Sequence, residues 1–250
     1  MNQARCKPGH PAIFQLETGQ AQAALEALAH PDKAAFLAGY FKTGPGQYGE
    51  GDRFLGVAVP AVRQLARRFR QVPLDGCDAL LASPYNEARL LALLILVDQY
   101  TRGNVATRNT VYLFYLARRQ RVNNWNLVDS SAPGIVGAHL LAQGRTVLYE
   151  LAHSPVVWDR RIAVLATLAF IRANDLADTF NLVELLLTDK HDLMHKACGW
   201  MLREAGRRNP AVLADFVRQH QSVMPRTLLR YAIERFAPEQ RAAILAGTFG

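Results

Sequence analysis

The sequence contains little cysteine, no long hydrophobic run and almost no alternation of polar and apolar residues. Its three cysteines, Cys6, Cys77 and Cys198, are scattered and form no C-x-x-C pair, which argues against a disulfide framework or a zinc knuckle and indicates a reducing cytoplasm. The longest apolar run, Leu90 to Val97, has the length of a buried helix segment and is too short to cross a membrane. The first residues contain no continuous apolar stretch of the signal-peptide type. We therefore expect a cytoplasmic protein without a membrane partner.

Acidic residues are the minority among the charged side chains. The 250-residue chain has 29 lysines and arginines against 21 aspartates and glutamates, which gives a net charge of +8 at pH 7. A strongly basic surface indicates a polyanionic partner, most often nucleic acid. The alternative is that the arginines only decorate solvated helix faces, and the net charge by itself does not decide between the two.

Helical periodicity runs along nearly the whole chain, as in NEARLLALLILVDQY from Asn86 and DRRIAVLATLAFIRAND from Asp159. Five similar helix starts, each polar or proline-bearing, follow one another at intervals of 33 to 38 residues. They begin at Ser83, Arg121, Ser154, Lys190 and Val223. Intervals of this length, with a second helix in each, predict an all-α, HEAT-like helical-repeat solenoid with a concave basic groove. An irregular all-α globule is the alternative.

The first third of the chain departs from this repeat. Five glycines lie between Gly44 and Gly56, but no strand is indicated before them, and the Gly-Lys-Ser/Thr ending of a phosphate-binding loop is absent. We interpret this stretch as a long ordered loop between helices, followed by a helix over Ala61 to Arg70 with Pro60 near its first turn. We expect one repeat domain over residues 1–250, with a flexible N-terminus over residues 1–14.

Three of the expected helices carry an aromatic and a charged side chain three or four positions apart, a spacing that places both on one face of a helix. The pairs are Trp125 with Asp129, Trp158 with Arg161, and Trp200 with Lys196. If these helices line the concave face, one patch would combine indoles, a carboxylate and basic groups; the alternative is that the tryptophans belong to the core. Asp129 lies too far into its helix to be an N-terminal cap if that helix begins near Asn123 or Asn124.

At these residues the sequence resembles the AlkD-type DNA alkylation repair glycosylases, and the resemblance covers nearly the whole chain. It is carried by FLGV from Phe54, NNWNLVDSSA from Asn123, WDRRIAVL from Trp158 and HDLMHKACGWMLRE from His191. The resemblance implies a HEAT-like solenoid that removes cationic N3- and N7-alkylated purines from double-stranded DNA in base excision repair. It also implies that Asp129 is the catalytic carboxylate, with Trp125 and Trp200 beside it.

The chemistry of this reaction suits a carboxylate without a partner acid. Alkylation at N3 or N7 makes the base a positively charged leaving group, and the charge that then develops on the deoxyribose is stabilised by a nearby carboxylate. By resemblance, Arg161 matches an arginine that contacts a backbone phosphate. We expect further DNA contacts from Lys196, Arg160 and Tyr48. We expect a monomer that uses no cofactor and no metal.

Two other functions remain open from the sequence. One is a non-catalytic HEAT-repeat module that binds DNA structures or proteins, against which the presence of Asp129 argues. The other is a metalloenzyme, because HDLMH places His191 and His195 four residues apart, with Asp192 in the position of the zincin glutamate. No third ligand is evident in the sequence for such a metal.

Overall fold

The structure, a computed structural model, describes residues 11–249 of the chain and their side chains from Glu17 onward. Within this range the chain forms helices and their connections and contains no strand; the only β-type contact there is an isolated bridge between Arg53 and Tyr85. The prediction of an all-α fold is confirmed. No helix in the described range is both long enough and apolar enough to cross a membrane. Most of the expected flexible N-terminus lies outside the described residues, and its last four residues belong to the first helix, which begins at Pro11.

The described chain divides into two compact units, one ending at Leu127 and the other beginning at Val128. A single repeat domain over the whole chain stays a prediction. The helices of the first unit are α1 (Pro11–Glu26), α2 (Pro31–Tyr40), α3 (Val59–Arg68), α4 (Leu74–Leu81), α5 (Asn86–Arg102), α6 (Val105–Ala117) and the short 3-10 helix η1 (Arg119–Arg121). Helix α7 (Trp125–Ser131) begins in this unit and ends in the next.

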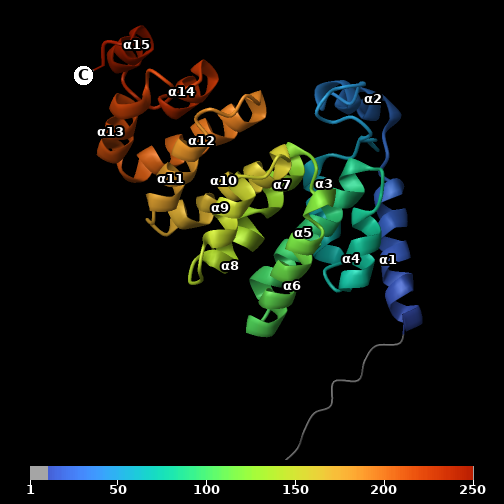
Figure 1. The fold of residues 1–250 in the computed structure, drawn as a ribbon. Helices are drawn as coiled ribbons and strands as arrows, with labels where there is room; N and C mark the ends of the chain where they lie inside the picture. The colour runs from blue at the N-terminus through green and yellow to red at the C-terminus, as the bar shows by residue number, and fades with distance from the viewer. Residues whose placement is uncertain (1–10, 250) are drawn as a thin grey trace, which may run out of the picture. The chain divides into compact units, whose positions relative to one another are not determined.

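Helix α5 is the centre of the first unit. It packs against α3, α4 and α6 (Figure 1), and its residues 88–96 are buried without interruption. A helix enclosed by neighbours on several sides is apolar around most of its circumference. All but the last residue of the apolar run from Leu90 to Val97 therefore lies in the core of this unit.

The second unit repeats one arrangement of helices. Its elements are η2, a π-helical turn (Pro133–Gly137), α8 (Ala138–Leu140), α9 (Thr146–Ala152), α10 (Val157–Arg172), α11 (Ala177–Leu185), α12 (Asp192–Arg208), α13 (Pro210–His220), α14 (Arg226–Ala232) and α15 (Pro238–Ala246). Helices α10, α12 and α14 pack in succession, while α9 and α11 lie beside α10, and α13 lies beside α12 (Figure 1). On α12, Gly199 allows the close approach of α14, because a Cβ there would lie 2.6 Å from the Leu228 carbonyl oxygen.

The predicted helix starts are found again, each within one turn of the expected position. The observed first residues are Asn86 for α5, Trp125 for α7, Val157 for α10, Asp192 for α12 and Arg226 for α14. The helix expected over Ala61 to Arg70 is α3. A HEAT-like solenoid over the whole chain is a finer statement than these helices establish, and it stays a prediction.

The glycine-rich stretch connects α2 to α3, as predicted, and a buried carboxylate fixes it in place. Asp52 accepts hydrogen bonds at Oδ2 from Asn86 Nδ2 (2.9 Å) and Asn124 Nδ2 (2.7 Å), and it forms an ion pair with Arg89. The Asp52 and Arg89 side chains are only 3% and 6% exposed. Asn124 in turn accepts a hydrogen bond from the Trp125 amide (2.8 Å). The loop is thus tied to the starts of both α5 and α7.

A second buried carboxylate accepts hydrogen bonds from the backbone amides at the end of this loop. Glu87 accepts hydrogen bonds from the amides of Leu55 (3.0 Å), Gly56 (2.8 Å) and Val57 (3.3 Å). Gly56 has a φ of +83°, and a Cβ at this position would lie 2.2 Å from the His30 carbonyl oxygen. Amides arranged in this way can bind an anion, but here the anion is the protein's own glutamate. This arrangement agrees with an ordered loop rather than a phosphate-binding one.

Two of the three cysteines lie in the described range, and both are buried and unpaired. Burial raises the pKa of the Cys77 thiol to about 12 and does the same for Cys198. These thiols therefore pack as small apolar side chains.

We predict that Asp52→Asn strongly destabilises the protein, because it leaves the buried Arg89 guanidinium without a counter-charge. The free energy of unfolding should fall by about 3–5 kcal/mol, the usual cost of breaking a buried pair, in urea denaturation. Asp215→Asn, which breaks an exposed pair with Arg218, should change it by no more than about 1 kcal/mol. Equal losses in the two variants would contradict a structural role for Asp52.

Candidate active site

Asp129 lies in the second turn of α7 and is held by an arginine from α10. Arg161 donates from Nε to Oδ1 and from Nη2 to Oδ2, each at 2.8 Å, which is the bidentate geometry of a guanidinium–carboxylate pair. The third nitrogen, Nη1, donates to the Leu193 carbonyl oxygen in α12 at 2.6 Å. One side chain therefore joins the ends of α7, α10 and α12 and fixes the plane of the Asp129 carboxylate.

The two members of this pair differ in exposure. The Arg161 side chain is 6% exposed, whereas the Asp129 side chain is 18% exposed. Each carboxylate oxygen accepts one N–H from Arg161 and has the capacity to accept another hydrogen bond. Burial raises the pKa of Asp129, and the hydrogen bonds and charge of Arg161 oppose this rise without cancelling it. The site is thus a half-buried carboxylate with a fixed orientation.

Trp125, one helical turn before Asp129 on α7, is half-buried and held by aromatic rings of the first unit. Its indole stacks on Phe41 with centroids 4.8 Å apart and an interplanar angle of 10°. Tyr40 meets the indole edge-on at 6.1 Å, and Phe41 also stacks on Phe54 at 4.8 Å. The first turn of α7 is therefore rigid at the position of the indole.

The structure draws attention to a tyrosine that the sequence did not single out. Tyr40, at the end of α2, is 57% exposed although its ring contacts Trp125. Tyr48, the predicted DNA contact, is half-buried and donates from its hydroxyl to the Tyr40 carbonyl oxygen at 3.4 Å. No local pattern distinguishes the two tyrosines, because only the tertiary contact with Trp125 sets Tyr40 apart.

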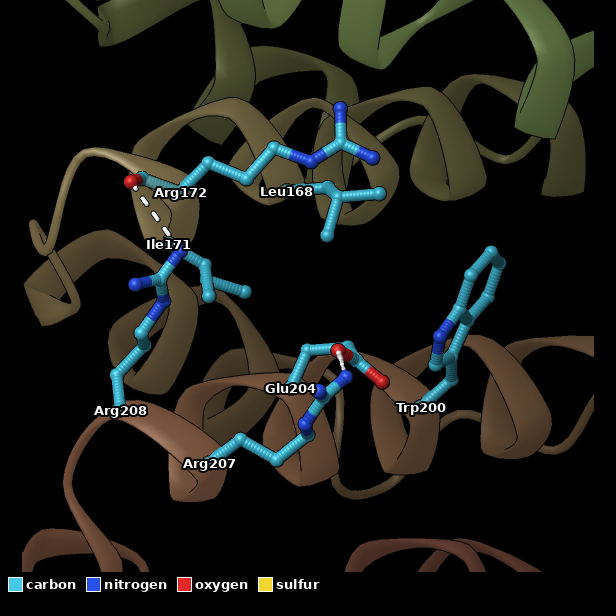
Figure 2. Close-up of a pocket in the computed structure, with 7 residues that line it drawn as sticks. All are labelled: Leu168, Ile171, Arg172, Trp200, Glu204, Arg207 and Arg208. Atoms are coloured by element: carbon cyan, nitrogen blue, oxygen red, sulfur yellow. Dashed lines mark hydrogen bonds and ion pairs between the residues drawn. The ribbon is translucent and has the colours of Figure 1, made fainter.

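Trp200 is half-buried on α12, seven residues beyond Leu193, and it lines a cavity between α10 and α12 (Figure 2). Seven residues correspond to about two helical turns, so Trp200 is well separated along α12 from the carbonyl that Arg161 binds. Trp158, the remaining tryptophan, is 8% exposed and belongs to the core. The sequence placed Trp158 and Arg161 together on one helix face. In the structure Trp158 is buried, and Arg161 pairs with Asp129 instead.

The predicted DNA contacts of the second unit already have partners within the protein. Arg160 forms an ion pair with Asp189 (Nε–Oδ2, 2.7 Å) and donates to the carbonyl oxygens of Ser154 and Pro155, both at 2.9 Å. Lys196 forms an ion pair with Asp192, at 2.7 Å, and its side chain is 42% exposed. Arg161 is buried against Asp129. Their contacts with DNA stay predictions, and Lys196 is the most accessible of the three.

The histidines of the zincin-like motif have structural contacts. His191 Nδ1 accepts the Leu193 amide hydrogen at the start of α12 (3.2 Å), and His195 Nε2 lies 2.5 Å from the Asp189 carbonyl oxygen. Across residues 11–249 no group of three His, Cys, Asp or Glu side chains has the geometry to hold a metal ion. His191 therefore serves as the N-terminal cap of its helix.

Comparison with known proteins identifies a family and a structure of similar fold. The family described as DNA alkylation repair enzyme matches residues 21–236, most of the chain. The fold is similar to that of a predicted DNA alkylation repair enzyme from Enterococcus faecalis, with a TM-score of 0.65 and 18% identity over 84% of this chain and 97% of that one. No curated protein matches the chain. At this identity the structural likeness shows the fold alone, whereas the family match includes α7, α10 and α12.

We predict that Arg161→Lys destabilises the protein although it keeps the positive charge. A lysine cannot reproduce the bidentate contact with Asp129 while also reaching the Leu193 carbonyl, so the free energy of unfolding should fall by about 1–3 kcal/mol. Arg218→Lys, at an exposed pair, is the matched control and should have an effect of about 0.5 kcal/mol or less. Thermal and urea unfolding of both variants measure the difference, and no difference would show that Arg161 does not tie the three helices.

Proposed function

The chain belongs to the DNA alkylation repair enzyme family, and we propose that it is a DNA glycosylase that excises cationic N3- and N7-alkylated purines from double-stranded DNA. The observation that carries this proposal is the Asp129 carboxylate, which is oriented by Arg161 yet remains partly exposed. In this proposal the protein acts as a monomer and uses neither cofactor nor metal.

The reaction requires little proton transfer to the leaving group. When the bond between C1′ and N9 of the alkylated purine breaks, its electron pair neutralises the positive charge of the base. Positive charge then develops on the deoxyribose, and Asp129 would stabilise it. A water molecule forms the new bond to C1′ and releases a proton to the carboxylate or to solvent. The products are the neutral alkylated base and an abasic site in the DNA.

Arg161 has a positioning role in this proposal. Its three hydrogen bonds hold the carboxylate plane before the substrate arrives, which avoids a reorganisation cost during the reaction. The phosphate contact predicted from the resemblance would require the nearly enclosed Arg161 guanidinium to leave Asp129 and the Leu193 carbonyl. Geometry therefore favours Arg161 as the support of Asp129 over Arg161 as the principal phosphate ligand.

The tryptophans would contact the damaged nucleotide. An indole face attracts positive charge, and Trp125 is held rigidly by Phe41 and Tyr40. Trp200 lines a cavity and is not part of the apolar core, which favours a binding role over a purely structural one. Both residues remain candidates for substrate contact on these grounds.

A non-catalytic DNA- or protein-binding module is the second candidate. One observation favours it: the bidentate pairing of Asp129 with Arg161 is also the contact that a purely structural carboxylate would make. Base release from methylated duplex DNA, with the products identified by mass, decides between the two functions.

We predict that Asp129→Asn slows base release by about a hundred- to a thousandfold, the effect of removing one preorganised electrostatic group. The substitution keeps the size of the side chain and removes its charge, so binding to undamaged duplex should stay the same or tighten. Rates should be measured in single turnover and corrected for spontaneous loss of N7-alkylguanine.

The matched control for this variant is Asp178→Asn. Asp178 is also paired with an arginine, Arg145, and its side chain is 16% exposed, close to the exposure of Asp129. The control should release base at the wild-type rate. Excision by Asp129→Asn at the wild-type rate would remove Asp129 from the mechanism.

The raised pKa of Asp129 predicts an acidic limit to activity. If the ionised carboxylate is the active form, the rate is full above its pKa and is lost as the pH falls through it, with a midpoint above the ordinary aspartate value of about 3.9. Asp129→Asn should lack this acidic limb, and its persistence in that variant would assign it to another group.

The raised pKa of Asp129 affects stability in the opposite direction from activity. A carboxyl whose pKa is raised by folding binds its proton more readily in the folded chain, so protonation of Asp129 stabilises the fold. Thermal unfolding at each pH therefore separates a loss of activity from a loss of structure.

A further inference from the structure

The cavity between α10 and α12 carries an excess of positive charge. It has a volume of about 450 Å³, within the second unit, and Figure 2 shows the side chains around it. The lining residues are Leu168, Ile171, Arg172, Trp200, Glu204, Arg207 and Arg208. The lining thus contains three arginines and one glutamate, and its other residues are apolar or aromatic.

The three arginines differ in how far their charges are already compensated. Arg207 forms an ion pair with Glu204 (Nη1–Oε2, 3.0 Å), and Arg208 donates to the Arg172 carbonyl oxygen at 3.4 Å. The Arg172 guanidinium has no hydrogen-bond or ion-pair partner within residues 11–249. In Figure 2 the Arg172 side chain extends along α10 toward Leu168. It therefore presents an uncompensated charge at the cavity.

Stabilisation of helix ends does not account for this side chain. Arg172 and Arg208 are the last residues of α10 and α12, where positive charge interacts favourably with the helix dipole. Arg208 fits that explanation, because it binds a carbonyl at the end of α10. Arg172 extends back toward Leu168, one turn earlier, and so points away from the last carbonyls of its own helix.

We propose that this cavity seats one phosphodiester group of the DNA strand, with Arg172 as its main ligand and Arg207 and Arg208 as supporting ligands. A planar guanidinium matches the oxygens of a phosphate group. The apolar wall of Leu168, Ile171 and Trp200 limits water and so strengthens the attraction between charges. This inference rests on the proposed function and adds to it a phosphate site that does not involve Asp129.

The compensated charges elsewhere in the second unit support this choice. Arg161 and Arg160, which the sequence predicts as DNA contacts, are bound by Asp129 and Asp189. Binding a phosphate at either would break an existing ion pair, whereas binding at Arg172 breaks none.

Fluorescence anisotropy with an undamaged duplex tests the proposal. Arg172→Ala should weaken binding about five- to tenfold at low salt, and the slope of log Kd against log salt, over roughly 50 to 200 mM, should shrink by about 0.9 for one lost phosphate contact. The control is Arg241→Ala, which removes the same charge from an exposed position of α15 outside the cavity. An effect of Arg172→Ala no larger than that of Arg241→Ala would overturn the proposal.

A second variant, expected to bind DNA more tightly, shows that the change in affinity does not come from unfolding. Glu204→Gln removes the carboxylate that repels phosphate and releases Arg207, so it should tighten duplex binding by a few-fold. Weaker binding by a folded Glu204→Gln protein, as judged by circular dichroism, would count against the site. If Arg172→Ala unfolds, Arg172→Gln, which retains most of the side-chain length, replaces it in the comparison.

Titration with inorganic pyrophosphate separates a DNA site from a site for a small free anion. A DNA phosphate site predicts that pyrophosphate binds weakly and competes with the duplex. Tight binding of pyrophosphate without displacement of DNA would overturn the proposal in favour of a small-anion site.

The failure of this inference differs from the failure of the proposed function. If Arg172→Ala binds DNA more weakly but the wild-type protein releases no base, the glycosylase proposal is wrong and the phosphate-site proposal stands. If the wild-type protein releases base and the Arg172→Ala and Arg241→Ala variants bind DNA equally well, only the phosphate-site proposal is wrong.

Discussion

The buried carboxylate of Asp52 is the interaction on which the first unit depends. It balances the charge of Arg89 and binds Asn86 and Asn124, residues 34 and 72 positions further along the chain. A loop without regular structure is thereby connected to the starts of two helices. Asn124 also accepts a hydrogen bond from the Trp125 amide. The position of the indole therefore depends on the contact between Asn124 and Asp52, which are far apart in sequence. The order of the glycine-rich loop and the position of Trp125 are thus parts of one arrangement.

The Asp52–Arg89 and Asp129–Arg161 pairs have different chemical capacities. In the Asp52–Arg89 pair both side chains are almost fully enclosed, so its charges serve only the fold. In the Asp129–Arg161 pair the arginine is enclosed while the carboxylate keeps an open edge. The same contact is thus a structural support in one place and, in the proposed reaction, the mount of the reactive carboxylate in the other. Exposure, more than pairing, distinguishes Asp129 from Asp52.

The sequence predicted the parts of this structure that arise from local chemistry. The starts of α5, α7, α10, α12 and α14 follow from polar or proline-bearing residues ahead of apolar helices, and the family followed from motifs within them. Long-range contacts carried no such local sign: Arg161 lies 32 residues from Asp129, and nothing near it in sequence indicates that it binds a carboxylate. Likewise, Tyr40 and Tyr48 are equivalent in sequence, and Arg172 resembles any arginine at the end of a helix. Their partners, or the lack of one, are decided by tertiary packing.

The burial of Cys77 and Cys198 has a consequence for the reaction of this protein with alkylating chemicals. Electrophiles that methylate the ring nitrogens of purines also react with sulfur, and they do so through the thiolate form. With a pKa of about 12, only on the order of one in 10⁵ of these thiols is ionised at neutral pH, and both are covered by neighbouring side chains. The two cysteines, one buried in each unit, are therefore poor targets for such electrophiles.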